Sequence, residues 1–488
     1  MMQTFNIHLI RQPLLLALLL SVSSGCALFK PDMKRSVEEA GSLLPEIYSV
    51  PASAEQASQL WWEDFHSADL DRLMGLALTQ NFTVVQAEAR MRQAEAQARK
   101  AGAALWPELS IAGEGSFTRQ YSSTPVNPEA GNTTDMESYS LGGLAASYEV
   151  DLWGRVRSTR NSAGLGYQAS RYDLETAWMS ISAQLAEQWL QLQSSQAQLK
   201  LLRKQLKTNQ TLVELLELRN RSGQATALDV VQQRQTAAAT ETLIPPVEST
   251  VAVLTNQINV LLGQSFASNL ALSGDAFPAL PPLPDAGLPS DLLTNRPDIQ
   301  AAELRLEAAG WSLAAAKADR LPAVRLSGSA IYQSDDFADL FDNWLANLAA
   351  GFVAPVFDGG RRSAEVQRNQ AVQDERLSAY KETVLRAITE VENALIREDR
   401  QAAYLEKLQK ELNYAKSALK EAQHRYRNGS IDYLNVLAAL TSVQLLEQDL
   451  IRGRQTLFRE RISLYRALGG TWTRQPHQPP VKEEKDTP

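Results

Sequence analysis

Cysteine and histidine are scarce in this chain, and it has no net positive charge. Its 488 residues include one cysteine and four histidines, so no disulfide can form within the chain and no zinc-ligand spacing occurs. The 56 acidic residues outnumber the 48 basic ones, which argues against binding nucleic acid through a basic surface. Phosphate-binding glycine loops, nucleophile elbows and metalloprotease motifs are also missing. The sequence therefore predicts a protein that is not an enzyme and needs no cofactor and no metal.

Long apolar runs are missing too, apart from a short one near the N-terminus. Residues 14–20 are apolar, basic Arg11 precedes them, and small residues follow up to Cys26. The run is too short to span a membrane, which takes about 20 residues, and its layout predicts a signal peptide over residues 1–25. Cys26 then stands where bacterial lipoproteins are cleaved and acylated, although an unmodified cysteine is the alternative. An acyl anchor would fix the location of the protein, with Ala27 favouring the outer membrane.

The sequence contains an internal repeat. The same spacing separates Gly223 from Gly429, Gly154 from Gly360, and the Leu-Gly pair at 262–263 from the pair at 468–469. A proline-rich stretch between the halves cannot be helix or central strand. The predicted organisation is an N-terminal lipoprotein segment 26–66, a first repeat 67–263, a linker 264–295, a second repeat 296–469 and a polar tail 470–488.

Each half has the same predicted order of elements. A helix ends at a Trp-Pro or Leu-Pro step, two strands follow, then a very long helix, a glycine turn and one second helix. The long helices are expected over 155–221 and 361–427, and at about 1.5 Å per residue each would span roughly 100 Å. Their sparse, heptad-like apolar spacing suits coiled-coil packing with one face in water.

The predicted strands have one apolar face and one face of small polar residues. They are expected over about 109–120, 139–151, 323–333 and 344–357. Such strands are what the wall of a membrane barrel requires, because the outside meets lipid and the inside meets water. Four strands cannot close a barrel, so the chain is expected to assemble with copies of itself.

Four motifs carry a resemblance to a known family. They are WWEDFHSADLDRLMGLALTQN (61–81), LPSDLLTNRPDIQAAE (288–303), PVFDGGRR (355–362) and its counterpart YEVDLWGRVR (148–157), and the two glycine turns at the hairpin tips match as well. The sequence resembles the TolC-like outer-membrane efflux family, in its lipoprotein branch that serves resistance-nodulation-division pumps. The resemblance implies a mainly α fold with a membrane β-barrel portion. It implies a homotrimer, with a twelve-stranded barrel built from four strands per chain and continuous with a long α-helical barrel.

The resemblance also implies partners and a location. The partners are a periplasmic adaptor (membrane fusion protein), an inner-membrane pump and outer-membrane lipid, with no nucleic acid. The location is the cell outer membrane, with the helices reaching into the periplasm.

Two glycine-containing motifs are interpreted as joints between barrel and helix. Aspartate can cap the helix that follows, and glycine permits a sharp reversal of the chain. A substrate-binding role is the alternative. The joint residues are Asp151, Gly154, Pro355, Asp358, Gly359 and Gly360.

The two hairpin turns are the strongest functional candidates. In the family such tips form the periplasmic mouth, where the adaptor docks and the channel narrows; otherwise the glycines are plain turn residues. The candidate docking residues are Ser222, Gly223, Gln224, Asn428, Gly429 and Ser430.

Residues beside the tips are candidates for a closable gate. Family members often carry acidic residues just past the tips, and the basic turn before the second tip would either tether the closed state or lie in solvent. The candidate gate residues are Asp229, Asp432, Asn435, Arg425, Tyr426 and Arg427.

The function expected from these features is a passive exit duct of a tripartite efflux pump, carrying small molecules such as drugs from the periplasm to the exterior. A coiled-coil structural protein of the cell envelope, an exported enzyme, and a duct for metal ions or polypeptides are the alternatives. The strands with a water-facing polar side disfavour the structural protein, because a coiled-coil spacer needs no barrel. No cluster of methionine or histidine residues indicates a metal cargo.

Overall fold

The computed structural model describes residues 29–32, 38, 41–42, 44–49, 60–113, 115–122, 134–266, 279–281 and 283–470. The predicted signal peptide, Cys26 and the polar tail beyond residue 470 lie outside these residues. The chain forms two compact units, which we call the sheet unit and the hairpin unit. The sheet unit contains Met91–Ser170 and Ala302–Tyr380, with the described residues up to Glu38. The hairpin unit contains Glu39–Arg90, Arg171–Ala301 and Lys381 onward.

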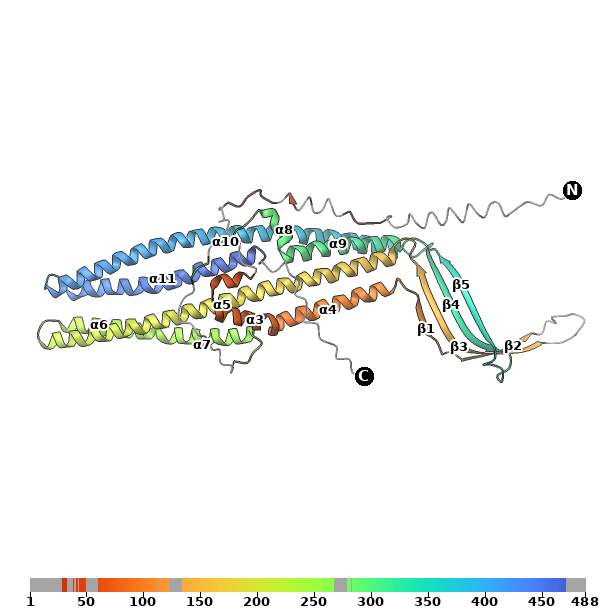
Figure 1. The fold of residues 1–488 in the computed structure, drawn as a ribbon, viewed down its shortest axis with the longest axis horizontal. Coiled ribbons are helices and arrows are strands. Elements are labelled where there is room, and N and C mark those ends of the chain that lie inside the picture. Colours follow the sequence, from red (N-terminus) through yellow and green to blue (C-terminus); the bar gives the residue numbers. More distant parts are fainter. Residues whose placement is uncertain are drawn as a thin grey trace, which may run out of the picture. The chain divides into compact units, whose positions relative to one another are not determined.

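Helices make up most of the described chain, as Figure 1 shows. They are η2 (Trp61–Phe65), α3 (Ala68–Gln80), α4 (Phe82–Ala103), α5 (Arg155–Arg221), α6 (Ala227–Thr242), α7 (Ile244–Leu261), η3 (Pro289–Asp291), α8 (Leu292–Asn295), α9 (Pro297–Ala318), α10 (Arg361–Arg427) and α11 (Tyr433–Ala467). The strands are β1 (Glu108–Ile111), β2 (Gly115–Ser122), β3 (Thr134–Val150), β4 (Ala323–Ser334) and β5 (Trp344–Val353).

The two very long helices are confirmed. α5 and α10 each run for 67 residues without a break (Figure 1), over the ranges that the sequence predicted. Neither helix contains a proline that would remove a backbone N–H and break the helical ladder. Over the described residues, no helix is both long enough and apolar enough to cross a membrane.

The prediction of a single second helix in each half is wrong for the first half. α11 continues unbroken for 35 residues, whereas the corresponding stretch is divided into α6 and α7 at Leu243. Pro245 and Pro246 stand in the first turn of α7. Their missing N–H groups are tolerated in a first turn but not in a helix interior, so the helix restarts there.

The strands form one antiparallel sheet in the order β1-β3-β4-β5, with β2 also paired to β3. The stretch expected as one strand at 109–120 is therefore two segments, β1 and β2, which share the same edge of β3. β3 begins at Thr134, earlier than expected, and β5 ends at Val353 just before Pro355, which has no N–H for the ladder.

A bulge crosses the middle of the sheet. The β3–β4 register shifts between Leu141 and Leu144, so β3 holds one more residue than β4 at this height. A Cβ on Gly143 would lie 2.2 Å from the carbonyl oxygen of Ala330, so only glycine fits there. The bulge explains why residues 140–150 alternate only loosely in the sequence.

An aromatic core lies in the hairpin unit, where the N-terminal motif meets the end of α11. Trp61 stacks on Tyr465 with ring centroids 5.4 Å apart, and Phe65 packs on Phe458 at 6.1 Å. The Tyr465 hydroxyl donates a hydrogen bond of 2.9 Å to Asp64. These contacts hold η2 against α11 and account for the aromatic WWEDF motif.

Candidate functional site

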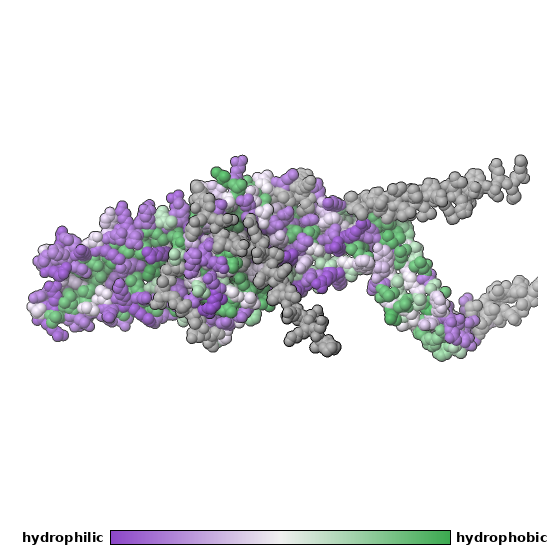
Figure 2. Space-filling view, in the orientation of Figure 1, coloured by the Kyte–Doolittle hydropathy of each residue, from purple (hydrophilic) through white to green (hydrophobic). Residues whose placement is uncertain are grey.

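One face of the sheet is apolar and open to its surroundings. Adjacent strands place apolar partners side by side in register, for example Tyr332 opposite Trp344 and Val324 opposite Phe352. Leu348 is 86% exposed and Ile111 83%. Figure 2 shows green apolar residues gathered over the strands. The large exposed residues of this face are Leu109, Ile111, Phe117, Tyr121, Leu144, Leu326, Tyr332, Trp344, Leu348 and Phe352.

The opposite face of the sheet carries mainly small and polar side chains. Ser327, Ser329 and Gln333 on β4 face neighbours such as Ser147 and Ser140 on β3. Ser116 and Ser140 share a hydrogen bond of 2.7 Å on the same face. A soluble sandwich would bury the apolar face and expose the polar one, whereas this sheet suits lipid on one side and water on the other.

Asp151 organises the first joint. Its carboxylate accepts hydrogen bonds from the backbone N–H groups of Val156 and Arg157, at 3.0 and 2.8 Å, in the first turn of α5. Gly154 has a φ of 78°, which favours glycine. The Arg157 guanidinium binds the same carboxylate at 3.2 Å. The carboxylate thus fixes the angle at which α5 leaves β3.

Asp358 organises the second joint in the same way. Its carboxylate accepts from the N–H groups of Gly360 and Arg362, at 3.1 and 3.3 Å. Burial alone would raise the pKa of Asp358, but these bonds and the Arg362 guanidinium hold that pKa below its usual value. Gly359 and Gly360 have φ of 62° and 84°, and Pro355 lies between the end of β5 and this turn.

The two hairpin tips have the same backbone design. Gln224 N–H donates to the Arg219 carbonyl at 2.8 Å, and Ser430 N–H donates to the Arg425 carbonyl at 2.9 Å. These bonds close the ends of α5 and α10 in Schellman-type turns. Their glycines have φ of 73° and 70°. The six predicted docking residues are all exposed: Ser222, Gly223, Gln224, Asn428, Gly429 and Ser430.

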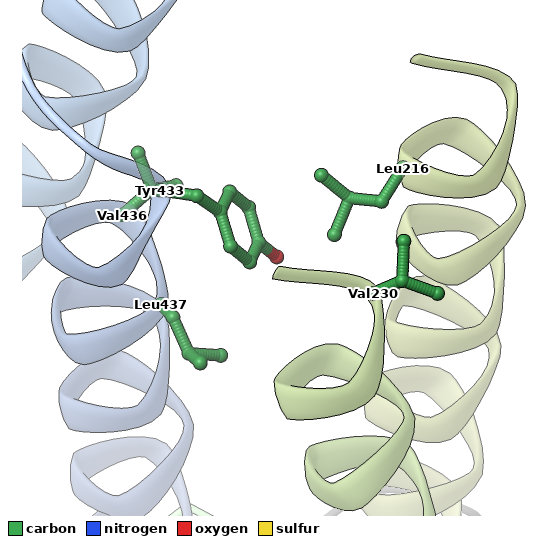
Figure 3. Packing of buried hydrophobic residues seen from close by; sticks show 5 residues of the cluster. All are labelled: Leu216, Val230, Tyr433, Val436 and Leu437. Carbon is green, nitrogen blue, oxygen red and sulfur yellow. The ribbon is translucent and has the colours of Figure 1, made fainter. Parts of the chain in front are cut away.

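Just behind the tips, the two hairpins pack on each other through a small buried cluster that includes Tyr433. Tyr433 of α11 reaches across to Leu216 of α5 and Val230 of α6 (Figure 3). Its hydroxyl donates a buried hydrogen bond of 2.7 Å to the Gln233 side chain. Tyr426 packs edge-on against Tyr433 at 5.5 Å, and the Arg219 guanidinium lies 5.0 Å from the Tyr426 ring.

A buried row of amide side chains continues this contact along the hairpins, and we call it the amide seam. Gln233 donates to the Asn209 carbonyl at 3.1 Å, and Gln444 donates to the Asn209 side chain at 3.0 Å. Gln448 donates to Gln205 at 3.0 Å. Amides buried in this way are costly unless they are paired, so the seam specifies how the two hairpins lie together. Its residues are Gln205, Asn209, Gln233, Gln444 and Gln448.

The predicted gate residues have different surroundings. Asp229 forms a capping box with Thr226 at the start of α6, with hydrogen bonds of 2.9 and 3.1 Å. Asp432 and Asn435 are exposed at the start of α11, and the Asp432 side chain caps no N–H.

The basic turn before the second tip is held by its own helix. Arg425 pairs with Glu421 at 2.8 Å and Arg427 donates to the Gln423 carbonyl at 3.2 Å. Among the six predicted gate residues, Tyr426 makes the contact between the hairpins, because its ring packs against Tyr433 and lies near the Arg219 guanidinium.

Sequence reasoning overlooked the amide seam and two buried arginines. Arg296, with 5% of its side chain exposed, binds Asp298 and Glu390 at 2.7 and 2.8 Å and donates to the Ala467 carbonyl at 2.9 Å. Arg461 forms a buried ion pair with Glu398. The seam amides recur at helical spacing, as in Gln205 and Asn209, and this periodicity was the available signal.

No metal centre emerges from the part of the chain that the structure describes. Within those residues, no group of three or more histidine, cysteine, aspartate or glutamate side chains could hold a metal ion. The described features are instead a two-faced sheet, two helix joints and a pair of exposed tips.

Comparison with known proteins decides the family. The model of the outer membrane efflux protein family matches residues 73–264 and 288–470. The chain belongs to the outer membrane efflux protein family. The efflux protein is 34% identical over 473 residues to the pyoverdine export outer membrane protein OpmQ of Pseudomonas putida, covering 95% of this chain and 97% of that protein. It is 31% identical over 489 residues to the toluene efflux pump outer membrane protein TtgC of P. putida, covering 97% and 98%.

The fold is that of solved outer-membrane channels. The efflux protein matches the outer-membrane channel OprN with a TM-score of 0.79 and 27% sequence identity, over 91% of this chain and 97% of that one. The resemblance to the TolC-like efflux family is thereby confirmed. Family membership makes the chain an outer-membrane efflux component and not an enzyme.

Proposed function

We propose that this efflux protein is the outer-membrane exit duct of a tripartite pump and works as a homotrimer. The observation that carries the proposal is the two-faced sheet. Its apolar face exposes Ile111 and Leu348 almost completely, while its polar face carries serines in register. In water this exposure would be costly and would favour aggregation, whereas in a bilayer the apolar face meets lipid.

The height of the sheet supports this placement. β5 has 10 residues from Trp344 to Val353. At about 3.3 Å per residue and a tilt of about 40°, such a strand spans about 25 Å along the membrane normal, which is about the height of the apolar band in known barrels. Trp344 and Tyr332 then lie at one rim of the band, where aromatic side chains are enriched.

The sheet edges support assembly with copies of the chain. β1 and β2 share one edge of the sheet and β5 forms the other, so the sheet has four strand positions and two edges. Unpaired edges are not tolerated in lipid, so β5 of one copy pairs with β1 and β2 of the next. Three copies supply the twelve-stranded barrel, four strands each, that the family resemblance implies.

The internal repeat supports one structural plan for both halves. α5 and α10 have 67 residues each, and α4 and α9 have 22 each. We assign the first repeat to 67–263 and the second to 296–469, joined by the linker 264–295, with 26–66 before them and 470–488 after. In the trimer the six hairpins form the α-helical barrel that continues the membrane barrel.

The exposed tips are proposed to dock a periplasmic adaptor, which links the duct to an inner-membrane pump. The amide seam and Tyr433 hold the two hairpins of one chain together behind the tips. The gate is proposed to close here, with Asp229, Asp432, Asn435, Arg425, Tyr426 and Arg427 around its mouth. A photo-crosslinker at Gln224 or Ser430 should capture the purified adaptor, whereas one at exposed Tyr404, far along α10, should not.

The proposed anchor is an acyl chain on Cys26. Radiolabelled palmitate should label the wild-type protein in growing cells and fail to label Cys26→Ser. Equal labelling of both proteins would overturn the assignment.

The proposed cargo is small molecules, since relatives of this chain are named for pyoverdine export and toluene efflux. Deleting the gene in its host should raise the accumulation of a fluorescent pump substrate, and wild-type protein should restore efflux. Gly75→Ala should restore efflux equally, because Gly75 lies on α3, away from the sheet edges, and a Cβ there has nothing within 4 Å. An outer-membrane protein that is present in normal amounts yet has no effect on accumulation would favour a scaffold.

A further inference from the structure

Charged side chains on the polar face of the sheet gather near its helix end. Among the described strand residues, the charged positions on this face are Glu108, Glu149 and Arg325. Among the strand residues whose side chains the structure describes, the rest of the face consists of small, amide and hydroxyl side chains, with Ile331, Leu345 and Val353 as the larger apolar ones. Over these residues, the polar face is therefore uncharged along most of its length and charged near the helices, at Glu108, Glu149 and Arg325, which we call the charged zone.

Within that zone, Glu149 and Arg325 stand directly opposite each other on β3 and β4. The closest approach of the Arg325 guanidinium to the Glu149 carboxylate is 4.0 Å. Glu149 is engaged more tightly by Arg155, through two hydrogen bonds of 2.9 Å each. Because this bidentate pair already neutralises Glu149, Arg325 is only loosely compensated.

The same zone borders a cavity of about 200 Å³ between the sheet and the ends of α5, α9 and α10. Its other charged lining includes Arg362, which pairs with Asp319 at 3.0 Å and with Asp358 at 3.3 Å. Arg325 differs from Arg155 and Arg362 because 69% of its side chain is exposed. It is therefore the guanidinium of this zone with most of its surface free for a passing solute.

We propose that Arg325 is a specificity-determining residue that contacts anionic groups of the cargo where they enter the barrel. The inference rests on the proposed function, because the polar face must line the lumen. Three copies then place three guanidinium groups at one height. A guanidinium presents planar paired donors that match a carboxylate, and its field reaches about 10 Å at 0.1 M salt. Solutes carrying carboxylates are the class of cargo it favours.

The test is ion selectivity of the purified full-length protein in planar bilayers. Under a KCl gradient at about 0.01 M, where the Debye length is about 30 Å, Arg325→Gln should lower the ratio of chloride to potassium permeability. One unit charge at roughly 10 Å in water changes a local ion concentration about twofold. We therefore expect the ratio of chloride to potassium permeability to fall by about twofold or more in Arg325→Gln. Arg325→Glu should shift the ratio further, and the differences should shrink at about 1 M salt.

Matched variants separate charge from damage to the fold. Arg325→Lys keeps the charge and should keep the wild-type ratio. Arg119→Gln removes an arginine whose side chain is 60% exposed, but Arg119 lies on the apolar face with Phe117 and should leave the permeability ratio unchanged. Arg325→Gln and Arg325→Glu channels that conduct with the wild-type ratio at low salt would overturn the inference. If the wild-type protein itself fails to conduct, the proposed function falls and the inference falls with it.

Discussion

Tyr433→Phe is the most revealing single substitution in the hairpin unit. It removes one hydroxyl and keeps the ring that packs against Leu216 and Val230 (Figure 3). The lost hydrogen bond is buried and 2.7 Å long, and its acceptor is the side-chain oxygen of Gln233. With no replacement donor in place, that oxygen would be left unpaired in the seam.

The expected size of the effect follows from that unpaired acceptor. Leaving a buried polar group unsatisfied costs about 1–3 kcal/mol. If separation of the hairpins opens the gate, this cost shifts the ratio of open to closed channels by roughly 5- to 150-fold in favour of the open state. Tyr433→Ala should act more strongly, because removing the ring adds a cavity cost of about 3–5 kcal/mol by analogy with Phe→Ala.

Open probability in single-channel recordings measures this shift directly. Tyr414→Phe is the matched control, since Tyr414 lies on α10 but is 65% exposed. The control should behave as wild type. Wild-type open probability in both Tyr433→Phe and Tyr433→Ala would refute the view that the seam holds the channel closed.

Three further predictions test other parts of the structure. Gly143→Ala places a Cβ 2.2 Å from the Ala330 carbonyl oxygen, so we expect a loss of about 1–3 kcal/mol in stability and a lower yield of heat-resistant trimer on gels, with Gly75→Ala on α3 unaffected. Arg296→Met strands Asp298 and Glu390 beside a neutral side chain, and the midpoint of thermal unfolding should fall by an amount equivalent to about 3–5 kcal/mol; an unchanged midpoint would show that the ion pairs do not stabilise the unit. Burial raises the pKa of Tyr433 above its usual 10.0, and the nearby Tyr426 and Asp229 raise it further. The neutral Tyr433 hydroxyl therefore contributes its full stabilisation below about pH 10, and this stabilisation is lost as the pH rises above about 10. Unfolding midpoints between pH 8 and pH 12 should therefore fall more steeply for wild type than for Tyr433→Phe, and parallel curves would contradict this.

The long helices and the family could be predicted from the sequence because their signals are local and repeated. Uninterrupted runs without proline set the bounds of α5 and α10, and paired landmarks such as Gly223 and Gly429 marked the two turns. The alternation of apolar and polar residues assigned the two faces of β4 and β5 before their register was known. Each of these features depends on neighbours along the chain.

The features that could not be predicted from the sequence depend on contacts between residues far apart in the chain. The pairing of Tyr433 with Gln233 and of Arg296 with Glu390 joins positions far apart in the chain. The division of α6 from α7 has a local signal in Pro245 and Pro246, which the repeat with the unbroken α11 does not reveal. The docking, gate and joint roles of the candidate residues stay predictions, and Cys26 lies outside the described residues.

Ionic conductance of the purified, full-length protein in a planar lipid bilayer tests the central claim most directly. The two-faced sheet predicts stable, discrete conductance steps without any nucleotide, with longer openings in Tyr433→Ala. A protein that assembles and enters the membrane yet passes no current, in the wild type and in Tyr433→Ala alike, would contradict the assignment as an exit duct.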